Sequence, residues 1–137
     1  MVLVSILALS GTAWGERLSV KAPLAEIRNG PGEQYDVIWQ IGKYHPIEII
    51  QKSGSWYRFT DSDKDEGWIH NSMLDRTPTV VTIKENCPIY SGAGMKFKVL
   101  FSTEKGVPFK VLGKKGDWIH IQHEDGDKGW IQKTLVW

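Results

Sequence analysis

Gly67-Trp68-Ile69 is repeated 62 residues further along the chain as Gly129-Trp130-Ile131. The register that aligns these triplets aligns residues 16–75 with residues 78–137 without a gap, and 14 of the 60 pairs are identical. Half of the identical pairs are glycine, proline or tryptophan, and outside the triplets these are Gly30 with Gly92, Gly32 with Gly94, Pro46 with Pro108, Gly54 with Gly116 and Trp56 with Trp118. A gapless repeat of this kind indicates two copies of one domain of about 60 residues.

The composition of the 137-residue chain is that of a globular protein. Hydrophobic residues make up 41% and charged residues 24%, which excludes wholesale disorder and collagen-like repeats. The chain has 14 glycines and 7 tryptophans, a combination that favours tight turns between short aromatic strands over long helices. The first expectation is therefore an all-β fold.

Alternating side chains predict strands in the middle of each copy. Residues 47–49 and residues 109–111 both read apolar, charged, apolar, which is the period of a half-buried strand. Gly54 and Gly116 then separate two apolar runs at matching places. Because glycine accepts a positive φ without steric cost, these positions predict hairpin turns.

The strand after each hairpin predicts which side chains face outward. Residues 56–59 (Trp-Tyr-Arg-Phe) align with residues 118–121 (Trp-Ile-His-Ile). The two isoleucines of the second stretch make the only sensible core face, so the register places Tyr57 and Phe59 inward in the first copy. The opposite face then holds Trp56, Arg58, Trp118 and His120.

Five short strands per copy are expected, with no helical period after residue 15. This pattern predicts a small antiparallel barrel or orthogonal sandwich for each copy. We place the first domain at residues 16–75 and the second at residues 76–137, with Pro78 in the short link between them.

These motifs resemble the bacterial SH3 domain (SH3b) family. The first copy has Ile27-Arg28-Asn29-Gly30-Pro31-Gly32, Tyr35-Asp36-Val37-Ile38, Lys52 to Trp56 and Gly67-Trp68-Ile69-His70 in the family's order. The second copy matches less closely, because Tyr90 replaces the arginine and Ala93 the proline. The resemblance implies two tandem SH3-like small β-barrels. It also implies an exported bacterial protein, of a family found beside cell-wall hydrolases, whose members bind peptidoglycan or its peptide cross-bridges.

The first fifteen residues have the features of a signal peptide. Residues 1–15 contain no charged residue, and an apolar run over residues 2–9 is followed by small residues up to Gly15. The basic residue that usually follows the initial methionine is missing, and a buried N-terminal strand is the alternative. The run is shorter than the roughly 20 residues of a membrane span. We therefore expect a periplasmic or secreted protein with no stable membrane span.

Catalytic, metal and cofactor sites are not expected. A single cysteine, Cys87, cannot form an internal disulfide, and a half-buried structural role is expected for it. His120 and His123 are three apart on a strand and so face opposite sides unless the strand ends between them. Residues 61–66 open like a calcium loop but lack its glycine and its last glutamate. We expect no enzyme in this chain, no metal site and no cofactor.

Aromatic side chains at matching positions are the candidate binding residues. Outward rings on a small barrel can form a shallow groove, although a domain of about 60 residues also needs large aromatics to fill its core. Trp56 and Trp118 are the best candidates for exposure, because their strand neighbours already face inward. The candidate ligand-binding residues are Trp56, Arg58, Trp118, His120, Arg28, Trp39, Trp68 and Trp130.

Charge limits the partners. Residues 16–75 hold seven basic and ten acidic groups (−3), whereas residues 76–137 hold ten and six (+4). The basic residues are scattered, so nucleic-acid binding is not expected. Two functions remain: an exported, non-catalytic module that binds cell-wall peptide or glycan through aromatic grooves, or an adaptor that binds an envelope protein.

Overall fold

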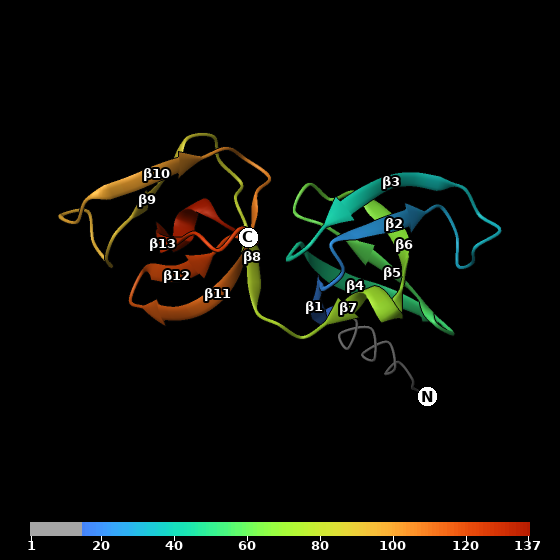
Figure 1. The fold of residues 1–137 in the computed structure, drawn as a ribbon. Helices are drawn as coiled ribbons and strands as arrows, with labels where there is room; N and C mark the ends of the chain where they lie inside the picture. Colours follow the sequence, from blue (N-terminus) through green and yellow to red (C-terminus); the bar gives the residue numbers. More distant parts are fainter. Residues whose placement is uncertain (1–14) are drawn as a thin grey trace, which may run out of the picture.

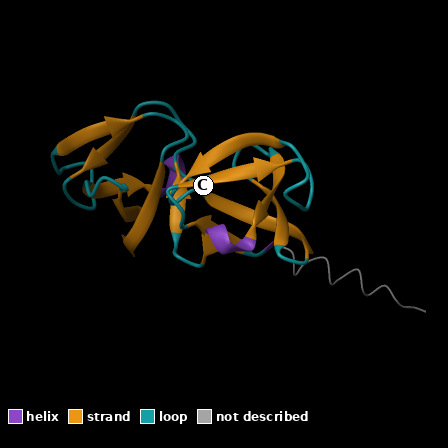
Figure 2. Ribbon diagram, turned by 45° about the vertical axis from the view of Figure 1, so that its right-hand side comes forward, coloured by secondary structure: helices purple, strands orange, loops and turns teal. Residues whose placement is uncertain are grey.

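The computed structural model describes residues 15–137, so the predicted signal peptide lies outside the described residues except for Gly15. The described chain forms two β-sheets that follow one another in sequence and lie side by side (Figure 1). A three-residue 3-10 helix follows the last long strand of each sheet, η2 (Asn71–Met73) in the first and η3 (Lys133–Leu135) in the second (Figure 2). In the described part of the chain, no helix is both long enough and apolar enough to cross a membrane.

The first sheet contains seven antiparallel strands, which we call the first domain. In sequence order they are β1 (Arg17–Val20), β2 (Leu24–Arg28), β3 (Val37–Gly42), β4 (Pro46–Ser53), β5 (Trp56–Thr60), β6 (Glu66–His70) and β7 (Leu74–Asp75). Their order across the sheet is β3-β2-β6-β5-β4-β1-β7.

The second sheet, which we call the second domain, contains six antiparallel strands. They are β8 (Thr79–Val81), β9 (Cys87–Tyr90), β10 (Val99–Thr103), β11 (Pro108–Lys115), β12 (Trp118–Gln122) and β13 (Lys128–Gln132). Their order, β10-β9-β13-β12-β11-β8, is that of the first six strands of the first sheet.

The prediction of an all-β chain with two tandem SH3-like domains is confirmed. Two details differ from the expected small barrels. The described strand ladders end at edge strands, so neither sheet closes into a complete barrel. Each copy also has more than five strands, because β1, β7 and β8 pair at the sheet ends, where sequence alternation is too short to show them.

Each sheet has its own hydrophobic core, made by alternate residues of its strands. Tyr57 packs against the first core and Phe59 is fully buried in it, as the register predicted. The other fully buried isoleucines and phenylalanines are Ile27, Ile47, Ile49 and Ile69 in the first core, and Ile89, Phe109, Ile121 and Ile131 in the second, where Phe109 is 1% exposed.

The glycines of the repeated triplets lie at close approaches between strands. A Cβ atom at Gly67 would overlap the Cγ2 atom of Ile27, and one at Gly129 would overlap the same atom of Ile89. Glycine is therefore required at both places for β6 to approach β2 and for β13 to approach β9.

The predicted hairpin glycines also have the expected conformation. Gly54 has a φ of 60° and Gly116 a φ of 58°, both in the left-handed region. These turns join β4 to β5 and β11 to β12, so the two long hairpins of the molecule have matching geometry.

The edge strands β3 and β10 expose apolar side chains. Their register against β2 and β9 shifts at Ile38 and at Leu100, where a β-bulge turns one extra residue outward. Ile38 is 45% exposed and Leu100 is 47% exposed. The exposed apolar residues at these edges are Tyr35, Val37 and Ile38 in the first domain, and Phe97, Val99 and Leu100 in the second.

Candidate functional site

Three neighbouring strands bring four of the five candidate residues of the first domain, Arg28, Trp56, Arg58 and Trp68, together on its outer face. Trp68 of β6 is directly opposite Arg28 of β2 on one side and Arg58 of β5 on the other. Two residues further along the same strands, and therefore on the same face, Trp56 is opposite His70. Side chains directly opposite each other in a sheet share a face, so these five residues form one surface.

A groove of about 430 Å³ runs beside this surface. Its volume is in the range of about 300–1,000 Å³ that is usual for ligand sites. The rings of Trp56 and His70 meet edge to face, with centroids 5.2 Å apart and planes at 87°. Both rings are half-buried. The residues that line the groove are Leu24, Glu26, Arg28, Glu33, Trp56, His70, Ser72 and Met73.

His70 is fixed by the 3-10 helix that follows β6. The backbone N–H of Ser72 donates to His70 Nδ1 at 3.2 Å, and the Ser72 hydroxyl lies 2.7 Å from the same nitrogen. Because Nδ1 accepts the backbone bond, the proton of the neutral ring is on Nε2. The groove is therefore lined by the Trp56 ring and by a His70 ring that Ser72 holds in place.

Arg28 fastens the loop between β2 and β3. Its Nη1 atom donates to the carbonyl of Tyr35 at 2.8 Å and to the carbonyl of Glu33 at 3.1 Å. The aromatic ring of Tyr35 covers Gly30, where a Cβ atom would overlap it. Arg28 thus shapes the groove wall by holding the loop.

Both predicted arginines of the first domain have acidic partners. Arg28 Nη2 lies 3.3 Å from Glu26 Oε1, and Arg58 Nη2 lies 2.8 Å from Glu66 Oε1. The Arg28–Glu26 pair and Glu33 line the groove and give it acceptors as well as donors, whereas Arg58 and Glu66 lie outside its lining. Such a lining suits a neutral polar chain, such as a peptide backbone or a sugar, better than it suits a strongly acidic ligand.

The second domain places the matching residues differently. Tyr90, which aligns with Arg28, is only 7% exposed, and its ring meets Trp118 edge to face with centroids 5.1 Å apart. His120 stacks on Trp130 with centroids 4.6 Å apart and planes at 7°. The Tyr90 ring therefore lies beside Trp118. In the first domain the matching residue, Arg28, lines the groove beside Trp56.

Trp39 lies apart from the groove. Its ring packs against the first core and meets Phe59 edge to face with centroids 6.2 Å apart. It also covers Gly67, whose added Cβ would lie 3.1 Å from the tryptophan ring. The position of Trp39 accounts for its size without a ligand.

The remaining candidates for chemistry have structural partners. Cys87 is fully buried, its thiol donates to the carbonyl of Lys84 at 3.1 Å, and burial raises the pKa of that thiol. Asp61 Oδ1 accepts backbone N–H bonds from Asp63 at 3.0 Å and Asp65 at 2.9 Å, which holds the turn. No group of three or more potential metal ligands occurs within residues 15–137.

Sequence reasoning missed several residues of the groove. His70 could have been found, because it lies two residues after Trp68 on one strand and so shares its face. Ser72 and Met73 lie in η2, whose position beside the groove has no sequence pattern. Leu24 is 55% exposed and could be recognised as a groove residue only in the structure.

The bacterial SH3 domain family matches this chain twice, over residues 21–76 and residues 83–137. The chain belongs to the bacterial SH3 domain family. The two matched segments lie over the two sheets, so each domain of the structure is one bacterial SH3 domain.

The curated relatives are longer proteins. YrvJ of Bacillus subtilis, which is named as an N-acetylmuramoyl-L-alanine amidase, is 22% identical over 121 residues, covering 80% of this chain and 23% of YrvJ. LytH of Staphylococcus epidermidis, named as a cell wall amidase, is 34% identical over 61 residues, covering 44% of this chain and 21% of LytH. The chain therefore spans between a fifth and a quarter of the length of these two relatives.

Solved structures of the NlpC/P60 group also align with the chain. A NlpC/P60 family protein from Bacillus cereus is 13% identical, with a TM-score of 0.41 over 89% of this chain and 56% of that one. NlpC1 from Trichomonas vaginalis is 11% identical, with a TM-score of 0.39 over 98% of this chain and 50% of that one. At these TM-scores the similarity carries no argument about function.

Proposed function

We propose that this chain is a non-catalytic, exported module that binds cell-wall peptide or glycan through the groove of its first domain. The observation that supports this most is the groove itself, in which Trp56 lies beside His70 and the loop held by Arg28. An aromatic ring next to polar donors and acceptors is a common way to bind a peptide or a sugar.

Membership of the bacterial SH3 domain family supports the cell wall as the partner. The relatives named as cell wall amidases support it as well, although the match covers only a part of each. We attribute the shared segments to binding and the amidase activity to other parts of those relatives. Cys87 supports a non-catalytic chain, because a buried thiol with a raised pKa is a poor nucleophile.

The alternative is an adaptor that binds an envelope protein. The exposed apolar residues along β3 and β10 favour it, because an unpaired edge strand can accept an extended segment of another protein. Exposed apolar residues are present at matching places in both domains, so this function would use both. The groove function, in contrast, would use the first domain alone.

Retention of the full chain on purified peptidoglycan sacculi tests the proposal. We expect the protein to sediment with sacculi and to be released by an excess of soluble peptidoglycan fragments. A protein that stays in the supernatant at every concentration would contradict cell-wall binding. Double substitution of Val37 and Ile38 by serine serves as a control, because it changes the β3 edge and leaves the groove residues in place.

Export is the part of the proposal that concerns residues 1–15. Their apolar run and small residues support removal by a signal peptidase. Fractionation of cells that express the chain with and without residues 1–15 tests it. Export of the shortened chain at the same level would contradict a signal peptide.

A further inference from the structure

The two domains meet at a second cleft, of about 350 Å³, on either side of the linker that joins them. Arg17 and Leu18 of β1 line it from the first domain, and Val80, Val111 and Lys114 line it from the second. The linker residues Arg76, Thr77 and Pro78, with Thr79 at the start of β8, complete the wall. The cleft does not involve any residue of the groove beside Trp56.

Arg17 is held in a fixed position at this cleft. Its Cζ atom lies 4.3 Å from the centre of the Trp137 ring, and its Nη2 atom donates to the carbonyl of Thr79 at 3.1 Å. A guanidinium that stacks on an aromatic ring keeps most of its five N–H donors free in one plane. That arrangement is suited to a carboxylate, which matches the guanidinium in a two-bond geometry.

The charges around the cleft favour an anion. The lining contains three cations, Arg17, Arg76 and Lys114, and no acidic residue. Glu16 pairs with Arg76 at 3.0 Å, and Glu48 is opposite Arg17 on the neighbouring strand, but neither carboxylate lines the cleft. Among the described residues Lys114 has no ion-pair partner.

We propose that this interdomain cleft is a second binding site, for a short apolar chain that ends in a carboxylate. Leu18, Pro78, Val80 and Val111 supply the apolar surface for the chain, and Arg17 and Lys114 bind its carboxylate from opposite domains. Because one cation comes from each domain, binding depends on the two domains being docked. The site is independent of the groove proposed above, since the two share no residue.

The test is a titration of the full chain, followed by amide and indole NMR signals. The probe is N-acetyl-Leu-Ala-Ala with a free carboxylate, compared with the same peptide as its C-terminal amide. We expect the acid to shift the signals of Val111, Lys114 and the Trp137 indole in a saturable way. The amide should bind at least about tenfold more weakly, because it lacks the charge-assisted bonds.

Lys114→Gln and Lys115→Gln form a matched pair of variants. Both residues are exposed at the end of β11 and both substitutions remove one positive charge, but only Lys114 lines the cleft. We expect Lys114→Gln to raise the Kd for the acid peptide by about tenfold and Lys115→Gln to leave it within about twofold. Equal effects of the two variants would overturn the proposal, because they would show only a general charge effect.

Two further outcomes would also overturn it. Equal binding of the acid and the amide would remove the carboxylate from recognition. Tighter binding of inorganic phosphate than of the acid peptide would assign the cleft to phosphate instead. Retention of Lys114→Gln on sacculi at the wild-type level is expected, so failure of this proposal and failure of the proposed function can be told apart.

Discussion

Gly67 lies against Ile27 in the first core, with no room for a further methyl group. We expect Gly67→Ala to lower the free energy of unfolding by about 1–3 kcal/mol, because the added Cβ must displace core atoms. Gly113→Ala is the control, since a Cβ there meets no atom within 4 Å and the residue does not have a positive φ. Urea unfolding of both variants checks this. Equal stability of Gly67→Ala and the wild type would mean that β6 does not approach β2 as closely as described.

His45 makes the stability of the first domain depend on pH. Burial lowers the pKa of His45 below its ordinary value of 6.5, and the nearby Asp61 and Asp63 oppose only part of this. As the pH falls through 6.5, His45 therefore takes up a proton in the unfolded chain before it does so in the folded chain. The folded state loses stability over this range, until the pH passes below the lowered pKa of His45 in the folded chain.

The second domain has a valine, Val107, at the position of His45. We expect His45→Val to lose less stability than the wild type when the pH is lowered from about 7.5 to about 5.5, because no proton is taken up there on unfolding. Unfolding in urea at the two pH values measures the difference. The same loss in the variant and the wild type would contradict a lowered pKa of the half-buried His45.

Sequence alternation predicted which side chains of the core strands are buried. It did not predict which side chains pack against one another on the outer face. Phe59 and Ile121 are buried where the register placed them, whereas Trp56 and Trp118, for which exposure was predicted, are half-buried. The alternation could not show that Tyr90 packs against Trp118, because that contact depends on the pairing of β9 with β13 and of β13 with β12. The two copies therefore match in sequence at the tryptophan, but the first has an open groove beside Trp56 and the second has the Tyr90 ring beside Trp118.

Strands β6 and β13 each contribute one isoleucine whose truncation should clearly lower the free energy of unfolding. Ile69 and Ile131 are fully buried in the two cores, and truncating either one to alanine should cost about 2–5 kcal/mol, the sum of lost burial and a cavity. Thermal or urea unfolding gives the value. A loss below about 0.5 kcal/mol would mean that these strands face the other way.

The β-bulges are a second feature that local sequence could not specify. Ile38 and Leu100 read as strand residues, and only the shifted pairing of β3 with β2 and of β10 with β9 turns them outward. Val37 and Val99 are exposed beside them, so an apolar strand pattern here marks a surface and not a core. The edge strands are therefore where sequence reasoning most easily misplaces side chains.

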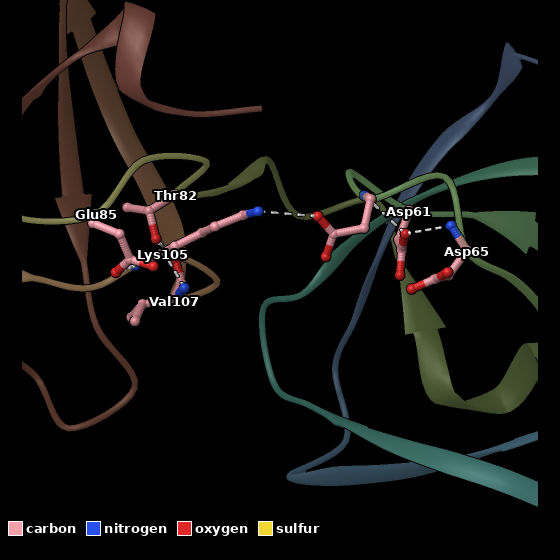
Figure 3. Close-up of polar contacts among 7 residues, drawn as sticks. Asp61, Asp65, Thr82, Glu85, Lys105 and Val107 are labelled. Atoms are coloured by element: carbon pink, nitrogen blue, oxygen red, sulfur yellow. Dashed lines mark hydrogen bonds and ion pairs between the residues drawn. The ribbon is translucent and has the colours of Figure 1, made fainter.

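At the scale of the whole molecule, long-range contacts join the two domains. Arg17 contacts Trp137 near the other end of the described chain, and no local motif could predict a contact between residues so far apart. Figure 3 shows a second contact, in which Lys105 extends from the second domain toward the turn that holds Asp61 and Asp65. The partner in this ion pair is Asp63, with Lys105 Nζ 3.6 Å from its Oδ1 atom.

These two contacts should not contribute equally to domain docking. The Lys105 and Asp63 side chains are 49% and 59% exposed, so Lys105→Ala should change the free energy of unfolding by less than about 0.5 kcal/mol. Arg17→Ala removes a stacked and hydrogen-bonded guanidinium, and we expect it to alter the relative orientation of the domains. Residual dipolar couplings, fitted to each domain separately, measure that orientation. A larger change of domain orientation in Lys105→Ala than in Arg17→Ala would contradict the prediction that Arg17 contributes more to docking.

The most direct test of the central claim compares Trp56→Ala with Trp118→Ala in binding to soluble peptidoglycan fragments. The two tryptophans occupy matching positions and are both half-buried, but only Trp56 lines the groove. We expect Trp56→Ala to weaken binding by about 1–3 kcal/mol, as for an aromatic anchor, and Trp118→Ala to leave it nearly unchanged. Circular dichroism of both variants confirms that they remain folded. Wild-type binding by a folded Trp56→Ala variant, or an equal loss in Trp118→Ala, would contradict a ligand groove in the first domain.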